Sequence, residues 1–187
     1  MGSGSSLARL PEAVTGDGVS ASSPVNRSSF ATTAADRLRI LETYRTIAMV
    51  GLSSNPFRPS HFAAVYMLAE GYRVIPVNPR EKEVLGQKSY ASLRDIPEPV
   101  EIADIFREPS AVPAIVEEAI AAGAKVIWMQ LGVIHDKAAE RARQAGLEVV
   151  MDRCVKIEHA RFFGGLSTIG LNTGVISSRR RRAIQAF

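Results

Sequence analysis

Apolar and polar residues follow two different patterns along the middle of the chain. Five short runs are apolar and rich in β-branched side chains, as expected of strands buried on both faces of a sheet: residues 46–51, 73–77, 102–106, 125–129 and 148–151. Three longer segments are predicted to be helices, the first because its apolar residues fall on helical spacing: residues 60–70, 110–122 and 136–145.

A glycine follows each of these three helical segments, and a β-branched run begins shortly after it. Gly71, Gly123 and Gly146 stand where a left-handed residue closes a helix. Strands that alternate with helices predict a parallel sheet covered on both faces. We therefore predict an α/β, Rossmann-like, doubly wound fold with a five-stranded, mainly parallel sheet in three αβα layers. Counted from the N-terminus, the predicted strand order is 3-2-1-4-5.

The second crossover, residues 79–101, is predicted to be a loop with at most a short helix near 92–95. In such folds the ligand lies beyond the carboxyl ends of the strands, where the strand order reverses. The segments that follow the strands are therefore the candidates for the site: Gly51 to Ser54, Asn78 to Lys82, Phe106 and Arg107, Gln130 to Gly132, and Asp152 to Cys154.

The loop after the first predicted strand has the composition of a phosphate-binding loop. Residues 50–60 contain one glycine, three serines and Arg58, and they lead directly into a predicted helix. A helix N-terminus offers unpaired N–H groups and the positive end of the helix dipole. The hydroxyl groups of Ser53, Ser54 and Ser60 add further donors. The loop alone predicts a phosphate, without naming the ligand.

A conventional dinucleotide site is not supported. The glycine pattern G-x-G-x-x-G is missing after Gly51, and the second strand ends in Asn78-Pro79 where such sites carry an acidic residue. Four cations lie at or near the expected rim of the site: Arg58, Arg80, Lys82 and Arg107. Because charge-assisted contacts to phosphate are strong, they favour an adenine nucleotide with a pyrophosphate and a ribose phosphate. NADP stays open as an alternative, since Asn78 and Arg80 would tolerate a ribose phosphate.

Length and composition indicate one domain with two tails. The 187 residues are 46% hydrophobic, which suits a single core at residues 36–165. Residues 1–35, rich in Gly, Ser, Ala and Thr, are predicted to be a disordered leader, with a transit peptide as a lesser alternative. Residues 166–187 are predicted to be a flexible tail. No apolar run is long enough for a membrane-spanning helix, and the single Cys154 fits a reducing cytosol.

The net charge of +4 comes from the C-terminal tail. Without the four arginines at 179–182, the chain carries 19 basic and 19 acidic residues. A nucleic-acid-binding domain needs a basic face on its folded part. Nucleic-acid binding through Arg179 to Arg182 is kept only as an alternative to a solvated tail.

Five groups of residues carry a resemblance to a known family. They are Gly51-Leu52-Ser53 with Pro56-Phe57-Arg58-Pro59-Ser60, Gly71-Tyr72-Arg73-Val74 with Pro76-Val77-Asn78-Pro79, Asp104-Ile105-Phe106-Arg107 with Pro109-Ser110, Trp128-Met129-Gln130-Leu131-Gly132, and Asp152-Arg153-Cys154 with Glu158-His159. Together they resemble the bacterial coenzyme A-binding protein family, stand-alone Rossmann-like proteins related to the amino-terminal domain of the succinyl-CoA synthetase α subunit. The resemblance covers about residues 40–163.

The resemblance implies that coenzyme A (CoA) or an acyl-CoA binds at the strand ends. It places Gly51, Ser53, Arg58 and Ser60 on the phosphates, and it places Asn78, Pro79 and Lys82 at the adenosine end. Phe106 becomes a wall for the adenine or the pantetheine arm, with Arg107 beside it. The implied function is a non-catalytic carrier, sensor or regulator. The alternatives are an NADP-linked oxidoreductase, or a CoA-dependent transferase or ligase subunit that requires a protein partner.

Cys154 is the residue for which the resemblance suggests chemistry, because the synthetase domain also has a cysteine close to the ligand. A thiol there would exchange disulfides with CoA if the adjacent helix N-terminus lowered its pKa. The alternative is that Cys154 is a small buried residue that only packs in the core. Gln130 is predicted to present its amide to the ligand, and Trp128 to pack in the core. His61, His135 and His159 have no metal-ligand spacing, and Glu158 and His159 are expected to cap or pair on the surface rather than to catalyse.

Overall fold

The computed structural model describes residues 1–2 and 32–164. The chain divides into two units, residues 1–30 and 31–187, and the fold below belongs to the second. Nearly all of the predicted leader and the whole predicted tail, with Arg179 to Arg182, lie outside the described residues. The first described element is helix α1 (Ala34–Thr43), which the sequence pattern did not predict. Its capping box pairs Thr33 with Asp36.

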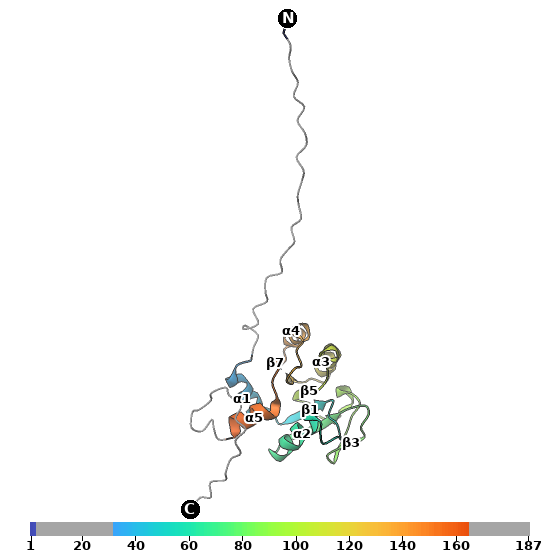
Figure 1. Cartoon of the computed structure of the whole chain (residues 1–187). Helices are drawn as coiled ribbons and strands as arrows, with labels where there is room; N and C mark the ends of the chain where they lie inside the picture. The colour runs from blue at the N-terminus through green and yellow to red at the C-terminus, as the bar shows by residue number, and fades with distance from the viewer. Residues whose placement is uncertain (3–31, 165–187) are drawn as a thin grey trace, which may run out of the picture. The chain divides into compact units, whose positions relative to one another are not determined.

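The centre of the domain is a parallel sheet of five strands, as predicted (Figure 1). The strands are β1 (Thr46–Val50), β2 (Arg73–Val77), β5 (Ile102–Ile105), β6 (Val126–Met129) and β7 (Glu148–Val150). Their order is β2-β1-β5-β6-β7, so β1 pairs with both β2 and β5. Val50, the last residue of β1, lies opposite Val77 on one side and Ile105 on the other.

The predicted strand order was wrong. The third strand in sequence, β5, lies beside β1 rather than beside β2. Both orders can be built with right-handed crossovers and with the same buried strands, and hydrophobicity shows that a strand is buried without showing its neighbours. The consequence concerns the site, since the order now reverses between β1 and β5 and the crevice opens there.

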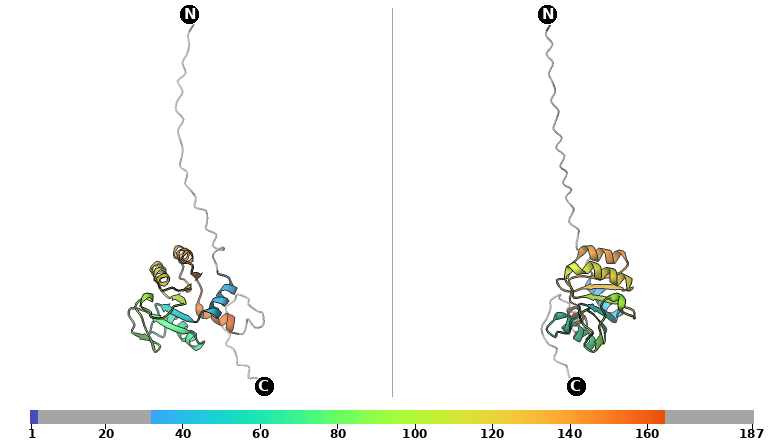
Figure 2. Two further views of the ribbon diagram at one scale, coloured as in Figure 1. Left: turned by 180° about the vertical axis from the view of Figure 1, so that it is seen from behind. Right: turned by 90° about the vertical axis from the view of Figure 1, so that its right-hand side faces the viewer.

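Helices cover both faces of the sheet (Figure 2). Buried side chains of α1, α2 (Pro59–Ala69) and α5 (Val155–Phe163) form one hydrophobic core with one face. Those of α3 (Val112–Ala121), α4 (Asp136–Gln144) and the short 3-10 helix η2 (Leu93–Asp95) form the other. The three predicted helices and the short helix near 92–95 are therefore confirmed.

The connection from β2 to β5 carries three small elements. They are a hairpin of β3 (Glu83–Val84) and β4 (Gln87–Lys88), followed by η2. A further 3-10 helix, η3 (Pro109–Ala111), leads into α3. Among the described residues, no helix has the length and apolar character needed to cross a bilayer.

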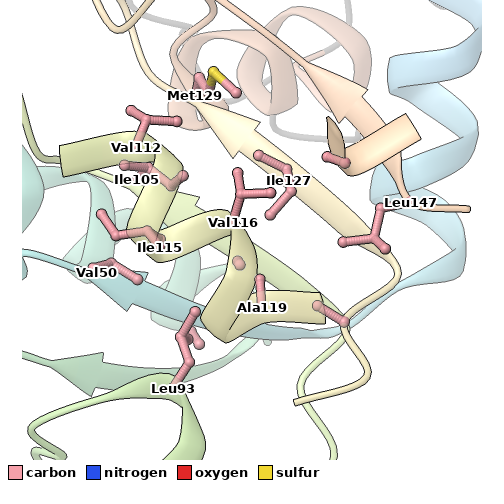
Figure 3. Close-up of a cluster of buried hydrophobic side chains, with 14 of the residues drawn as sticks. Val50, Leu93, Ile105, Val112, Ile115, Val116, Ala119, Ile127, Met129 and Leu147 are labelled. Carbon is pink, nitrogen blue, oxygen red and sulfur yellow. The ribbon is translucent and has the colours of Figure 1, made fainter. Parts of the chain in front are cut away.

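Alternating side chains of each strand divide between the two cores. Val50, Ile105, Ile127 and Met129 point toward α3, where they pack with Val116 (Figure 3). Their sequence neighbours face the α2 and α5 side, because side chains of a strand alternate between its two faces. Trp128 is fully buried there, and its indole N–H donates to the carbonyl oxygen of Arg153 at 2.7 Å. The prediction that Trp128 packs in the core is confirmed.

Candidate functional site

Gly51 follows β1 and lies beside the loop that follows β5. Its φ is +89°, and its N–H donates to the carbonyl oxygen of Val77 at 2.8 Å. A Cβ atom at this position would lie 2.8 Å from the carbonyl oxygen of Phe106 and 2.8 Å from Cδ of Arg107. The loops that follow β1 and β5 therefore approach each other so closely that only glycine fits between them.

The loop after Gly51 is held in shape by its own side chains. Ser53 Oγ accepts the N–H of Asn55 at 3.2 Å, and Asn55 Oδ1 accepts the N–H of Phe57 at 2.9 Å. Ser60, buried at the start of α2, accepts the N–H of Ser53 at 3.3 Å. The Ser60 hydroxyl therefore supports the loop from inside, whereas the sequence suggested that it contacts phosphate directly. Arg58 stands at the N-cap of α2, and Pro59 begins the helix.

A carboxylate occupies the outer donors of this loop. Glu81 Oε1 accepts the backbone N–H of Ser54 at 3.0 Å and its hydroxyl at 2.8 Å. These two bonds hold the pKa of Glu81 below its usual value. The carboxylate oxygen stands where an oxygen of a phosphate group would find the same two donors. No acidic residue was among the predicted ligand contacts, so Glu81 was overlooked, although the sequence shows an acid between Arg80 and Lys82.

Asn78 ties the second loop to the first. Its Nδ2 donates to the carbonyl oxygen of Leu52 at 2.8 Å, and its Oδ1 accepts the N–H of Arg80 at 3.1 Å. Both ends of this half-buried amide are thus engaged within the protein. The family resemblance implied that Asn78 contacts the adenosine end of a ligand. In the structure, its side chain joins the loops after β1 and β2.

The four predicted cations belong to the loops that follow β1, β2 and β5. Arg58, Arg80, Lys82 and Arg107 are all exposed, and within residues 32–164 none of them forms an ion pair. Pro79 is also exposed, and Phe106 is half-buried beside Gly51. Phe57 is 86% exposed at the tip of the first loop. The loops after β1, β2 and β5 thus bring together unpaired positive charge and exposed aromatic surface.

Gln130 lies apart from these loops, on the face of the sheet. It is buried, and its Nε2 donates to Oδ1 of Asp104 at 2.6 Å. Asp104 is fully buried, its Oδ2 has no hydrogen-bond partner, and burial raises its pKa to about 8. Asp104 was not among the predicted site residues, although an aspartate within the apolar run 102–105 is unusual. The role of Gln130 as a ligand contact stays a prediction.

Cys154 is not an activated thiol. It occupies the N-cap of α5 and is half-buried. Burial raises its pKa, and the backbone N–H groups of Ile157 and Lys156 offset this only in part. The expectation that the helix N-terminus lowers this pKa was wrong, because desolvation outweighs the helix end. A high pKa leaves little thiolate at neutral pH, so the structure does not support rapid disulfide exchange with CoA.

Glu158 and His159 are buried structural groups. Glu158 bonds to Arg37 at 2.8 Å and to Arg161 at 3.0 Å, and His159 Nδ1 lies 3.0 Å from the hydroxyl of Tyr66. Burial lowers the pKa of His159. The expected surface pairing was wrong in its location, since Glu158 pairs in the interior. Among the described residues no three His, Cys, Asp or Glu side chains form a metal-binding group.

The loops after β1, β2 and β5 lie where the strand order of a doubly wound α/β sheet reverses, which is the place where such folds bind ligands. Comparison with known proteins gives the family. The profile of the CoA binding domain family matches residues 45–160. The chain therefore belongs to this family, which confirms the family resemblance and the fold class. Family membership indicates coenzyme A as the ligand in general terms.

Three similar proteins illustrate the range of the family. The Bacillus subtilis protein YneT is 39% identical over 126 residues, which are 67% of this chain and 93% of YneT. A hypothetical protein from Pyrococcus horikoshii OT3, of solved structure, is 43% identical with a TM-score of 0.70, over 71% of this chain and 94% of that one. The ADP-forming acetate–CoA ligase II of Archaeoglobus fulgidus is 30% identical over 75% of this chain but only 21% of the ligase.

Proposed function

We propose that the crevice formed by the loops after β1, β2 and β5 binds coenzyme A or an acyl-CoA, and that the protein is a non-catalytic carrier, sensor or regulator in the cytosol. The observation that carries the proposal is the Glu81 carboxylate on the N–H and hydroxyl of Ser54. It marks an oxyanion position in loops that also carry four cations without an ion pair to other described residues. CoA, with its pyrophosphate and ribose phosphate, needs several cations of this kind.

We divide the residues of these loops into those that hold the loops in shape and those that would contact the ligand. Gly51, Ser53, Ser60 and Asn78 shape the loops through their internal hydrogen bonds. Ser54, Arg58, Arg80, Lys82 and Arg107 are the contacts we assign to the phosphates. We assign Phe106 and Pro79 to apolar contact with the ligand.

Calorimetry with the purified chain tests the proposal. We expect binding of CoA, and we expect Arg58→Gln and Arg107→Gln each to weaken it about tenfold or more, since each removes a charge-assisted contact to phosphate. Arg141→Gln is the matched control, because Arg141 lies on α4 and pairs with Glu117. Binding of NADP without CoA would replace this proposal with the oxidoreductase alternative.

Replacing Glu81 tests the stand-in role of its carboxylate. We expect Glu81→Gln to bind CoA about tenfold more tightly, because a repulsion on the order of 1 kcal/mol between the carboxylate and a phosphate is removed. Glu83→Gln, two residues further along on β3, is the control and should leave the affinity unchanged. If Glu81→Gln weakened binding instead, the carboxylate would be a fixed part of the site rather than a group that the ligand displaces.

We assign no catalytic role to the residues of these loops. The acidic and imidazole groups that suggested acid–base chemistry are engaged in buried contacts. The match covers 21% of the acetate–CoA ligase, and a CoA-dependent ligase or transferase subunit that requires a protein partner stays the alternative.

A further inference from the structure

A second concave site lies at the other end of the same sheet edge. A pocket of about 390 Å³ is bordered by the loops after β6 and β7, by α5 and by Arg37 of α1. Its lining residues are Arg37, Leu131, Arg153, Cys154, Ile157, Glu158 and Arg161. The volume is in the range that small-molecule sites occupy, and no residue of the phosphate-binding loop belongs to the lining.

The charge of this pocket is strongly unbalanced. Three arginines face a single carboxylate, that of Glu158, and both of its oxygens are already engaged by Arg37 and Arg161. Arg153 is exposed, and its side chain donates to the neighbouring carbonyl oxygen of Asp152 at 2.9 Å. A guanidinium has five N–H donors, so these bonds leave donors available. The pocket is therefore suited to an additional carboxylate.

The rest of the lining is apolar. Leu131 is 55% exposed although it is a large hydrophobic residue, and Ile157 and Cys154 continue this surface along α5. A short hydrocarbon chain that ends in a carboxylate would match both parts of the lining. A neutral acyl chain would satisfy the apolar part and leave the arginines without a partner.

The position of the pocket suits the far end of a bound CoA. The phosphate-binding loop follows β1, and Cys154 follows β7, three strands away along the same carboxyl edge. Adjacent strands lie about 4.8 Å apart, so the separation is about 14 Å. The pantetheine arm of CoA, when extended, spans such a distance. An arm that starts at the phosphates and follows the edge of the sheet would deliver its thioester to the pocket.

We infer that this pocket binds the acyl group of a CoA thioester whose acyl chain ends in a carboxylate, such as a dicarboxylic acyl-CoA. The inference rests on the proposed function, because the phosphates must be held at the loop after β1. Arg153 and Arg161 bind the terminal carboxylate, while Leu131 and Ile157 contact the methylene groups. Arg37 keeps the Glu158 carboxylate in place.

A pair of thioesters of equal chain length tests the inference. Glutaryl-CoA and pentanoyl-CoA both carry five-carbon acyl groups, and they differ in a terminal carboxylate against a methyl group. We expect calorimetry to give about tenfold or tighter binding for glutaryl-CoA, since the carboxylate forms charge-assisted bonds. Arg153→Gln and Arg161→Gln should reduce this preference. Arg141→Gln should preserve the preference.

The possible failures are distinguishable. If the chain binds CoA but gives equal affinities for the two thioesters, the acyl assignment is overturned and the proposed function stands. A preference that persists in both arginine variants would also overturn the assignment. If free glutarate binds tightly without any preference between the thioesters, the pocket is a site for free dicarboxylates instead. Failure to bind CoA at all would overturn the proposed function and this inference with it.

Discussion

Gly51→Ala should abolish CoA binding and destabilise the domain by about 2–4 kcal/mol, because a left-handed conformation and a steric clash are imposed together. The alanine would hold a φ of +89°. Its Cβ atom would also lie 2.8 Å from a backbone carbonyl oxygen, that of Phe106, which has no freedom to rotate away. Relief requires the loops after β1 and β5 to separate. Urea denaturation and calorimetry with CoA measure the two effects.

Gly123→Ala is the control that separates the two causes. Gly123 has a φ of +72°, and nothing lies within 4 Å of a Cβ atom at that position. This variant therefore has the conformational cost without the clash, on the order of 1 kcal/mol, and CoA binding should be retained. Equal loss of stability in the two variants, with CoA binding intact in both, would show that the close approach at Gly51 does not shape the site.

Asp104→Asn should stabilise the protein at neutral and alkaline pH and flatten the dependence of its stability on pH. The pKa of Asp104 is raised from 3.8 to about 8 by burial. Between these two values the folded state keeps a proton that the unfolded state has released, so raising the pH favours unfolding. The contribution of this group to stability is therefore fully present below about pH 4 and is lost as the pH rises to about 8.

The expected size of this effect is on the order of 1 kcal/mol for each pH unit between the two pKa values. Asparagine has nearly the same shape, still accepts the Gln130 amide through its Oδ1, and does not ionise. Urea denaturation at pH 5, 6, 7 and 8 should show a gain for Asp104→Asn that grows with pH. Asp136→Asn, at an exposed position in α4, should show no such growth. A constant difference across the series would mean that Asp104 does not titrate in this range.

The pattern of the sequence predicted the elements of the fold because each element depends on nearby residues. The glycines at 71, 123 and 146 all have positive φ, as the helix-ending pattern required. The helices before them and the strands after them appear where the periodicity placed them. Helix α1 was missed because its buried residues are few and a capping box, rather than an apolar stripe, marks its start.

The predicted site residues stay a prediction, and the structure adds the hydrogen bonds that several of them form. The cations at 58, 80, 82 and 107 can be found from the sequence because a phosphate ligand requires them. The hydrogen-bond partners of these residues cannot be found from the sequence, because they depend on which loops lie side by side in the fold. Hydrogen bonds join Asn78 to Leu52, Ser60 to Ser53, and Glu81 to Ser54. The sequence does not show that the residues of each pair lie close together in space.

The local sequence also did not reveal how strongly burial changes the pKa of ionisable side chains. Cys154 stands at a helix N-terminus, which favours a thiolate, yet burial raises its pKa. The same effect keeps a proton on Asp104, a residue that composition counts as an anion. Both shifts depend on the atoms that surround the group, and those atoms come from several elements of the fold.

The sequence by itself determined the α/β class, the places of the strands and most helices, a phosphate-binding loop after the first strand, and the family to which the chain belongs. These depend on periodicity, turn residues and local motifs, all of which act over short stretches of chain. Only the tertiary structure decided that β5 lies beside β1, and therefore that Gly51, Phe106 and Arg107 form one crevice. Strand neighbours depend on long-range packing between faces that are equally apolar, so hydrophobic patterning cannot distinguish the possible orders.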